Sequence, residues 1–339
     1  MVENLVGNRN PMVEYLNTTF PTSYTWNYDV FKQDLRKLYE KAKDAQWNAQ
    51  TKLDWGQDVD PEAEYLPDSQ NGIYGTHIWR KMTDSEIRHM RHEMFAWTLS
   101  QFLHGEQGAL LATAQIVDAV PLADAKFYAS TQVMDEARHV EVYDKYLREK
   151  LELLYPINKN LKKLLDSILT DSRWDMKYLG MQIMVEGLAL AAFQFIHTFT
   201  KEPLIKELTR YVMLDEARHV AFGVITLRDF CTKELNEKEL QERQDFVYEA
   251  SILMRDRFSG EEVFERLGLP VAECVELNMK SPAMKEFRKM LFSKIVPNLK
   301  RIGLLTGDLR QRFAAPELDI LKFEDWAVTD VDNVDKIQF

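Results

Sequence analysis

The sequence predicts an all-α protein built on a four-helix bundle with additional flanking helices. Glycine and proline are sparse, with 13 and 11 in 339 residues, which favours long uninterrupted helices over a β-sandwich. Apolar residues recur at three- and four-residue steps through four long segments, as in helices that bury one face. The connections between these segments are short, which predicts antiparallel neighbours and hence a bundle.

The residues before the bundle, 1–82, are expected to form an irregular arm with one helix at about 28–52. Asp, Pro and Gly are dense after that helix, which predicts a loop. Thr83 and Glu86 have the spacing of a capping box, so they open a helix that runs to about residue 117.

Prolines and a serine mark the other bundle helices. Pro121 and Pro203 suit first turns, where a missing N–H is harmless, and Ser172 is a capping residue. The predicted ranges are 121–155, 173–200 and 203–235, so the bundle spans 83–235.

Residues 236–339 are expected to pack on the same domain as C-terminal helices and an acidic tail. Ser281 would cap the last of these helices and Gly303 would end it. The predicted ranges are 237–258, 261–267 and 282–302.

Net charge and cysteine usage narrow the function classes. The chain carries a formal net charge of −11 and has no block of Lys or Arg, so we expect no nucleic-acid partner. The two cysteines, Cys231 and Cys274, form neither a disulfide framework nor a metal knuckle. This usage suits a reducing cytoplasm.

No targeting or membrane signal is expected. The first twelve residues lack the basic and then apolar regions of a signal peptide. The most apolar stretch, Val185–Phe199, is interrupted by polar residues and is too short to span a bilayer. The sequence therefore predicts a cytoplasmic protein without a membrane span.

One six-residue sequence occurs twice. Asp-Glu-Ala-Arg-His-Val stands at Asp135–Val140 and again at Asp215–Val220, 80 residues later. Thirty residues before the glutamate of each copy, another glutamate interrupts an apolar helical stretch, at Glu106 and at Glu186. The chain thus carries four carboxylates and two imidazoles in a duplicated arrangement.

This arrangement predicts a binuclear metal site. A glutamate and a histidine three positions apart on a helix differ by about 60° in azimuth and about 4.5 Å in height, so both can reach one ion. One glutamate from each of two helices, with Glu-x-x-His from each of two others, is the ligand set of binuclear carboxylate sites in bundles. Oxygen and imidazole ligands without thiolate favour two iron ions, with manganese or mixed manganese–iron as alternatives. The predicted ligands are Glu106, Glu136, His139, Glu186, Glu216 and His219.

At these residues the chain resembles the ferritin-like carboxylate-bridged diiron proteins. That group includes multicomponent monooxygenase hydroxylases, acyl-carrier-protein desaturases, arylamine N-oxygenases and ribonucleotide reductase small subunits. The resemblance covers roughly residues 85–235. It implies a diiron oxidoreductase with O2 as co-substrate, and a homodimer as a common assembly.

The resemblance also implies residues that support the ligands. In this group the Asp before a ligating Glu commonly bonds the ligand His of the partner helix, which would pair Asp135 and Asp215 with the histidines of the opposite copy. Arg138 and Arg218 would then neutralise these acids. Such a carboxylate fixes the imidazole tautomer and raises its basicity.

Three departures from the resembling proteins leave the reaction open. Hydroxylases and desaturases carry a threonine one turn after the third glutamate, where this chain has Ala189 and Leu190. Arylamine N-oxygenases have a further ligand His one turn before the last Glu-x-x-His glutamate, where this chain has Val212. Ribonucleotide reductase small subunits commonly have Asp as first ligand, where this chain has Glu106.

Tyr143 stands four residues after the first ligand His, the place of the radical tyrosine in ribonucleotide reductase small subunits. It would either take part in the oxidation chemistry as a catalytic residue or serve only as a packing tyrosine. Its counterpart in the second copy is Gly223, which would either open space for substrate or allow close helix packing. The two metal positions therefore need not have equivalent surroundings.

The helical neighbours of the first and third glutamates predict a substrate pocket. They are mostly apolar and would stand beside open coordination positions, which suits O2 and an organic substrate. The predicted pocket residues are Leu103, Leu110, Thr113, Ile183, Leu190, Phe193 and Gly223.

Three functions remain open. The first is an O2-dependent oxidase or oxygenase that acts on a small or hydrophobic organic substrate by hydroxylation, N-oxygenation, desaturation or a related oxidation. It would need an external electron donor, because no flavin or nicotinamide fingerprint is visible. The second is a radical-generating subunit that uses Tyr143, and the third is a ferroxidase, for which iron itself is the substrate. A purely structural bundle is the remaining alternative.

Overall fold

The computed structural model describes residues 13–329 and 334, and all regular structure in this part of the chain is helical. The predictions for the first twelve residues and for the end of the acidic tail lie outside the described residues. The α-helices are α1 (Gln33–Asp44), α2 (Ala49–Lys52), α3 (Asp84–Ala119), α4 (Ala123–Tyr146), α5 (Lys159–Thr170), α6 (Trp174–Tyr178), α7 (Glu186–Phe199), α8 (Pro203–Lys233), α9 (Glu237–Asp256), α10 (Glu261–Arg266), α11 (Val271–Lys280), α12 (Pro282–Met290), α13 (Val296–Arg301) and α14 (Gly307–Ala314). Two π-helical segments, η3 (Leu147–Leu151) and η4 (Leu179–Val185), join them. The 3₁₀ turns are η1 (Asp68–Gln70), η2 (Trp79–Lys81), η5 (Arg257–Ser259), η6 (Leu291–Lys294) and η7 (Leu321–Phe323).

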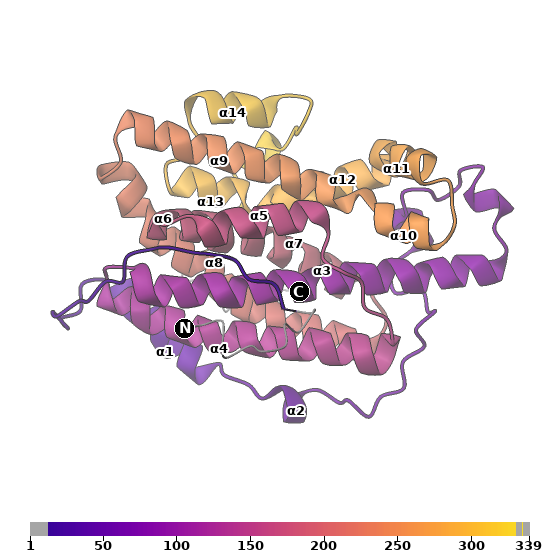
Figure 1. Ribbon diagram of the computed structural model, residues 1–339, viewed down its shortest axis with the longest axis horizontal. Coiled ribbons are helices and arrows are strands. Elements are labelled where there is room, and N and C mark those ends of the chain that lie inside the picture. Colours follow the sequence, from indigo (N-terminus) through magenta and orange to yellow (C-terminus); the bar gives the residue numbers. More distant parts are fainter. Residues whose placement is uncertain (1–12, 330–333, 335–339) are drawn as a thin grey trace.

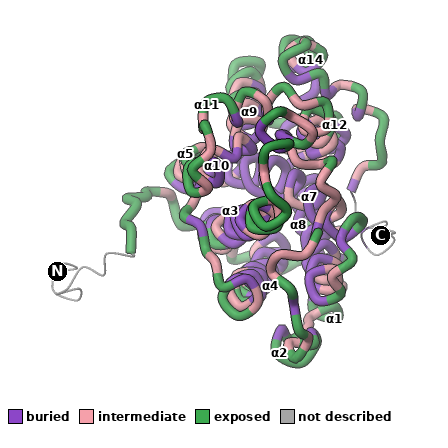
Figure 2. Tube along the Cα trace, turned by 90° about the vertical axis from the view of Figure 1, so that its right-hand side faces the viewer, coloured by how far each residue is buried: buried purple, intermediate pink, exposed green. Residues whose placement is uncertain are grey.

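Four long helices form the centre of the molecule (Figure 1). α3 packs along α4, α7 packs along α8, and α4 contacts α8 across the bundle. Seen along the helices, the buried residues concentrate where these four helices meet (Figure 2). The predicted all-α four-helix bundle with flanking helices is therefore confirmed.

The starts of the bundle helices follow local capping signals. Thr83 Oγ1 accepts a hydrogen bond from the backbone N–H of Glu86, whose carboxylate accepts one from the N–H of Thr83, so the predicted capping box opens α3. Pro203 occupies the first turn of α8 as predicted. Pro121 lies outside its helix, because α4 begins two residues later.

The third bundle helix is wound in two ways along its length. It begins at Trp174 rather than directly after Ser172, and the π-helical segment η4 precedes α7. Segments of this kind are rare and concentrate at functional sites, and η4 ends directly before Glu186. The continuous helix Trp174–Phe199 is long and apolar enough to cross a membrane, but 83% of its most apolar window is buried inside the protein. Such burial is what a core helix shows.

The flanking helices depart most from the sequence prediction. The single helix predicted at about 28–52 is divided into α1 and α2, and the second of these restarts after Asn48, whose side chain caps it. The helix predicted at 282–302 is divided into α12, η6 and α13. Three further helices, α5, α11 and α14, lie in segments that were predicted as connections or tail.

Helix α1 covers one side of the bundle and packs against α4 and α8. Asp124, in the first turn of α4, accepts hydrogen bonds from the backbone N–H groups of Phe31 and Lys32 at 2.9 and 3.0 Å. The same carboxylate pairs with Arg36. These bonds fix the helix in place, and the loop that follows it reaches the side chains around the centre of the bundle.

Candidate metal centre

The six predicted ligands come from all four bundle helices, and each is buried, with at most 5% of its surface exposed. The duplicated motif thus brings two helix pairs, α3 with α4 and α7 with α8, to one position in the core. The contributions are Glu106 from α3, Glu136 and His139 from α4, Glu186 from α7, and Glu216 and His219 from α8.

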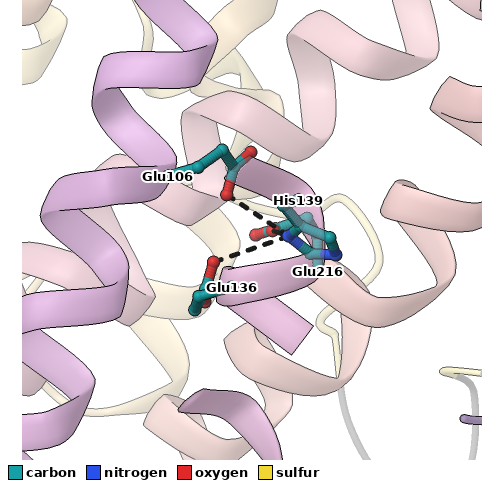
Figure 3. A group of neighbouring side chains, drawn as sticks. All are labelled: Glu106, Glu136, His139 and Glu216. Carbon is teal, nitrogen blue, oxygen red and sulfur yellow. Dashed lines mark hydrogen bonds and ion pairs between the residues drawn. The ribbon is translucent and has the colours of Figure 1, made fainter. Parts of the chain in front are cut away.

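Three carboxylates surround the imidazole of His139 (Figure 3). Its Nδ1 lies 3.3 Å from Glu106 Oε2, 3.1 Å from Glu216 Oε1 and 3.5 Å from Glu136 Oε2. One ligand atom from each of these four residues lies within 4.8 Å of the others. A single ion placed among them would be reached by three oxygens and one nitrogen.

A second group forms around His219. Its Nδ1 lies 3.1 Å from Glu136 Oε1, and Glu186 completes the group within the same 4.8 Å limit. Gln132, one turn before Glu136, donates from Nε2 to both carboxylates at 2.9 and 2.8 Å. The sequence analysis missed Gln132, although its position one turn before a ligand on the same helix was a usable signal.

Each ligand imidazole turns its other nitrogen toward an aspartate of the opposite helix. His139 Nε2 lies 3.2 Å from Asp215 Oδ2, and His219 Nε2 lies 3.3 Å from Asp135 Oδ2. An Nε2–H donated to a carboxylate leaves the Nδ1 lone pair available for a metal. This crosswise pairing is the one that the family resemblance implied.

Two arginines hold these aspartates. Arg138 pairs with Asp135 and also lies 3.0 Å from Asp215. Arg218 pairs with Asp215. Burial opposes ionisation of Asp215, but its hydrogen bond with His139 and the charge of Arg218 outweigh burial and lower the pKa of this carboxyl.

The loop between α1 and α2 completes the layer around the ligands. Gln46 Nε2 donates to Asp135 at 2.8 Å, and its Oε1 accepts from Arg138 at 2.8 Å. Trp47 Nε1 donates to Asp215 at 2.8 Å, and its ring lies beneath the guanidinium of Arg138. Neither loop residue is predictable from the sequence, because an irregular arm has no periodic pattern from which to place its side chains.

The charges of the cluster do not balance without a cation. Burial raises the pKa of Glu106 and Glu186 well above the ordinary value, and the neighbouring carboxylates of Glu216 and Glu136 raise them further. Burial also opposes ionisation of Glu136, but the imidazoles of His219 and His139 outweigh burial and lower the pKa of Glu136. A bound cation would therefore favour the ionised form of Glu106 and Glu186.

Unpartnered polar atoms point to the same conclusion. In the described part of the chain, five ligand atoms have no hydrogen-bond partner: Glu136 Oε2, Glu186 Oε2, both carboxylate oxygens of Glu216, and Nδ1 of His219. Buried polar atoms without a partner are rare and need an explanation. Two divalent cations would coordinate these atoms and balance four carboxylates, and the oxygen and imidazole donors suit iron or manganese. The residues present fit a dimetal centre.

Asp215→Asn is expected to weaken metal binding although it removes no proposed ligand. The neutral amide no longer raises the basicity of the His139 imidazole, so affinity should fall by about 10- to 100-fold. Titration of the metal-free protein with Mn(II), with free Mn(II) followed by EPR, measures this affinity. Asp229→Asn, at a surface carboxylate of the same helix that pairs with lysines, is the control. Equal affinity in the two variants would contradict the coupling.

Two cavities lie along α3 and α7. The smaller, of about 20 Å³, reaches the carboxylates of Glu106, Glu186 and Glu216. The larger, of about 150 Å³, lies farther along the same two helices and is mostly apolar. Phe102 lines both cavities.

Only one of the seven predicted pocket residues lines the small cavity. Phe193 lines it, and the other six predicted residues line neither cavity. Helix positions three and four residues from a ligand lie on both sides of that ligand, whereas the cavity borders only one side of it. Phe102 and Ala109 flank Glu106 on the cavity side, and the predicted Leu103 and Leu110 are each one residue, or about 100°, away from them. The residues outside both cavities are Leu103, Leu110, Thr113, Ile183, Leu190 and Gly223.

Gly223 lies at a close contact between helices. A Cβ at this position would lie 2.7 Å from Gln182 Cβ and 3.1 Å from Ile183 Cδ1. The π-helical segment η4, which contains both of these residues, therefore packs directly against α8 here.

Tyr143 is fully buried beside the ligands. Its ring contacts Phe102 and Phe193, with centroids 6.0 and 5.8 Å away. Burial, and then the charge of Glu106, raises the pKa of its hydroxyl well above the ordinary value. The hydroxyl has no hydrogen-bond partner among the described residues, so packing alone does not explain why it is a tyrosine.

Comparison with known proteins gives a family and a fold. The sequence model of the family described as p-aminobenzoate N-oxygenase AurF matches residues 31–303. An R2-like ligand-binding oxidase, whose metal cofactor was reconstituted aerobically, superposes with a TM-score of 0.52 at 17% identity, over 82% of this chain and 95% of the other. The same kind of oxidase with an aerobically reconstituted Mn/Fe cofactor gives a TM-score of 0.51 at 17% identity, over 81% and 94%. No match was found among curated proteins.

Proposed function

Because the chain belongs to the family of the p-aminobenzoate N-oxygenase AurF, we propose that it is a diiron oxygenase that inserts oxygen from O2 into a small organic substrate. The observation that carries this proposal is the buried cluster of four glutamates and two histidines beside a cavity. The six ligands would be the residues that the duplicated motif predicts. Manganese, or manganese with iron, is the alternative metal content.

The metal ions would supply the redox chemistry by activating O2. The protein supplies orientation. The aspartate of each outer pair would fix the Nε2–H tautomer of a ligand imidazole, and Arg138 and Arg218 pair with these aspartates. Phe102 and Phe193 form an apolar part of the cavity wall, which would disfavour water beside a bound substrate.

The proposed reaction needs an external electron donor. Insertion of one oxygen atom into a C–H or N–H bond, with the second atom released as water, takes two electrons and two protons from outside the substrate. The free cysteines Cys231 and Cys274 are buried, which is consistent with the reducing cytoplasm proposed as the compartment. A homodimer, common in the resembling group, is the proposed assembly.

The substrate atom that is oxidised is not fixed by family membership. N-oxygenation of an arylamine is the first candidate, since it is the activity that names the family. Val212, fully buried one turn before Glu216, stands where the arylamine N-oxygenases have a further ligand His. A site with one imidazole fewer supports the wider proposal of oxygenation of a small organic substrate.

Oxygen consumption by the loaded protein tests the proposed function. Protein loaded with Fe(II) and supplied with a chemical reductant should consume O2 faster when 4-aminobenzoate or another small acid or amine is present. Labelled O2 should appear in the product by mass spectrometry. A loaded protein that takes up two ions but consumes no O2 beyond the reductant blank would contradict the proposal.

Tyr143→Phe separates the oxygenase from the radical-generating alternative. Removal of a hydroxyl without a hydrogen-bond partner should leave the melting temperature within about 1 °C and the metal content unchanged. An oxygenase should retain turnover within a factor of about three. A subunit that stores a tyrosyl radical would instead lose its radical EPR signal, so a wild-type radical that disappears in the variant together with function would favour that alternative.

A further inference from the structure

Arg257 is a buried cation that the proposed metal centre does not use. It follows α9 directly, has 5% of its surface exposed, and lines the small cavity together with Glu106, Glu186 and Glu216. No carboxylate of the described residues forms a salt bridge with its guanidinium. Its guanidinium contacts the ring of Phe258, 5.0 Å from the ring centroid.

An isolated buried charge is strongly unfavourable unless a group of opposite charge accompanies it. Among the described residues, three other buried arginines pair with aspartates, namely Arg138, Arg218 and Arg243, and a fourth, Arg288, donates to the backbone carbonyl of Met279. Burial lowers the pKa of Arg257 to about 10, so the group is still charged at neutral pH. A charge kept in a cavity wall without a protein partner indicates an anionic ligand.

The electrostatic setting changes when the metals bind. Glu106, Glu186 and Glu216 line the same cavity as Arg257, so without metal their carboxylates would oppose the entry of an anion. Two divalent ions would balance the four ligand carboxylates, and the positive charge of Arg257 would then attract an anion into the cavity of the loaded protein. An anion is therefore attracted to the cavity in the state that would react with O2.

The two cavities together limit the size of the ligand. The small cavity, of about 20 Å³, has room for about one water molecule, or for a head group of similar size. The larger cavity, of about 150 Å³, has the size at which an apolar cavity binds benzene. Phe102, packed edge to face against Phe193 at 4.7 Å, lines both cavities. Phe258, next to Arg257 in sequence, lines the larger one.

We infer that Arg257 is the anion anchor of the substrate site and binds the carboxylate of a small organic acid. The apolar body of that acid, no larger than about one aromatic ring, lies against Phe102 and extends toward the larger cavity. A guanidinium binds a carboxylate through two parallel N–H···O bonds, so it fixes the direction of the acid as well as its position. The inference depends on the proposed function only in calling the cavity a substrate site.

Calorimetric titration with benzoate and its neutral analogue benzamide tests the anchor. Wild-type protein loaded with Mn(II) under anaerobic conditions should bind benzoate more tightly than benzamide. Arg257→Met should weaken benzoate by about 10-fold or more and leave benzamide unchanged. Arg257→Lys should restore part of the preference, because it keeps the charge without the planar fork. Arg301→Met, at an exposed arginine of α13, is the control and should behave as wild type.

A structural role for Arg257 predicts a different pattern. The methionine variant would then melt at a lower temperature, and its affinity for benzoate and for benzamide would fall equally. That result overturns the inference. An anchor predicts an unchanged or higher melting temperature, since an unpaired buried charge is removed. Failure of wild type to prefer benzoate also overturns the anchor, even if O2 consumption is normal. A benzoate preference that depends on Arg257 in a protein that consumes no O2 supports the anion site and contradicts only the oxygenase function.

Discussion

Replacement of Glu136 by glutamine will remove the metal centre, with metal content falling from about two ions per chain to near zero. Glu136 is the residue shared by both groups of candidate ligands. Its Oε1 lies 3.1 Å from His219 Nδ1, and its Oε2 lies 3.5 Å from His139 Nδ1. Each oxygen thus faces one imidazole, and an amide keeps the shape of the side chain but loses the charge that both ions would share.

Metal analysis after loading with Fe(II) and desalting measures this effect, and O2-dependent turnover should fall by at least about 100-fold with it. Glu141→Gln is the matched control, since Glu141 lies on the same helix but is exposed. Glu186→Gln should have a smaller effect, because Glu186 belongs to one group only. Retention of two tightly bound ions by Glu136→Gln would rule out the shared role.

Metal loading will raise the melting temperature by about 5–10 °C, and the increase will grow with pH. Binding at 1,000 times the dissociation constant contributes about 4 kcal/mol, and a chain of this size gains roughly 2 °C for each kcal/mol. Burial opposes the charge of both ligand imidazoles, but Glu106 beside His139 and Glu136 beside His219 outweigh it, so the pKa of each histidine is raised. In the metal-free protein, protons therefore take the place of the ions.

The sign of the pH effect follows from these raised values. A group whose folded pKa is raised stabilises the fold fully below its unfolded pKa, about 6.5 for histidine, and that stabilisation is lost as the pH rises through the folded value. The metal-free protein should thus melt at lower temperature from about pH 6 upward, while metal binding improves as protons leave the ligands. Calorimetry at about pH 6, 7 and 8 measures the melting temperatures of the chelated, metal-free protein and of the reloaded protein. A gap between the two forms that narrows as pH rises would contradict the argument.

The proposed ligands were predictable because their positions depend on helix geometry alone. Glu136 and His139 share one helical face through their three-residue spacing, and the second copy repeats it 80 residues later. Burial then follows from the apolar surroundings of each motif. The crosswise partners Asp135 and Asp215 needed a family resemblance, since no spacing rule relates residues on different helices.

Contacts from irregular segments were not predictable in this way. Gln46 and Trp47 reach the aspartates only because α1 docks on α4 and α8, and Arg257 reaches the cavity only because α9 ends beside it. These contacts depend on tertiary packing, which the local sequence pattern does not predict. The division of the helix predicted at about 28–52 has the same origin, since Asn48 restarts the chain through a cap and not through periodicity.

The π-helical segment η4 adds a residue to the helix that carries Glu186 without changing the direction in which Glu186 points. A π turn spans i to i+5 and so accommodates one residue more than an α turn, whereas an extra residue elsewhere in an α-helix rotates everything after it by about 100°. A relative that holds its third glutamate at the same place on an unbroken α-helix would accordingly be one residue shorter between Trp174 and Glu186. All seven residues of this segment are buried, and the two halves of the duplicated bundle differ in their winding although the spacing of their motifs is equal.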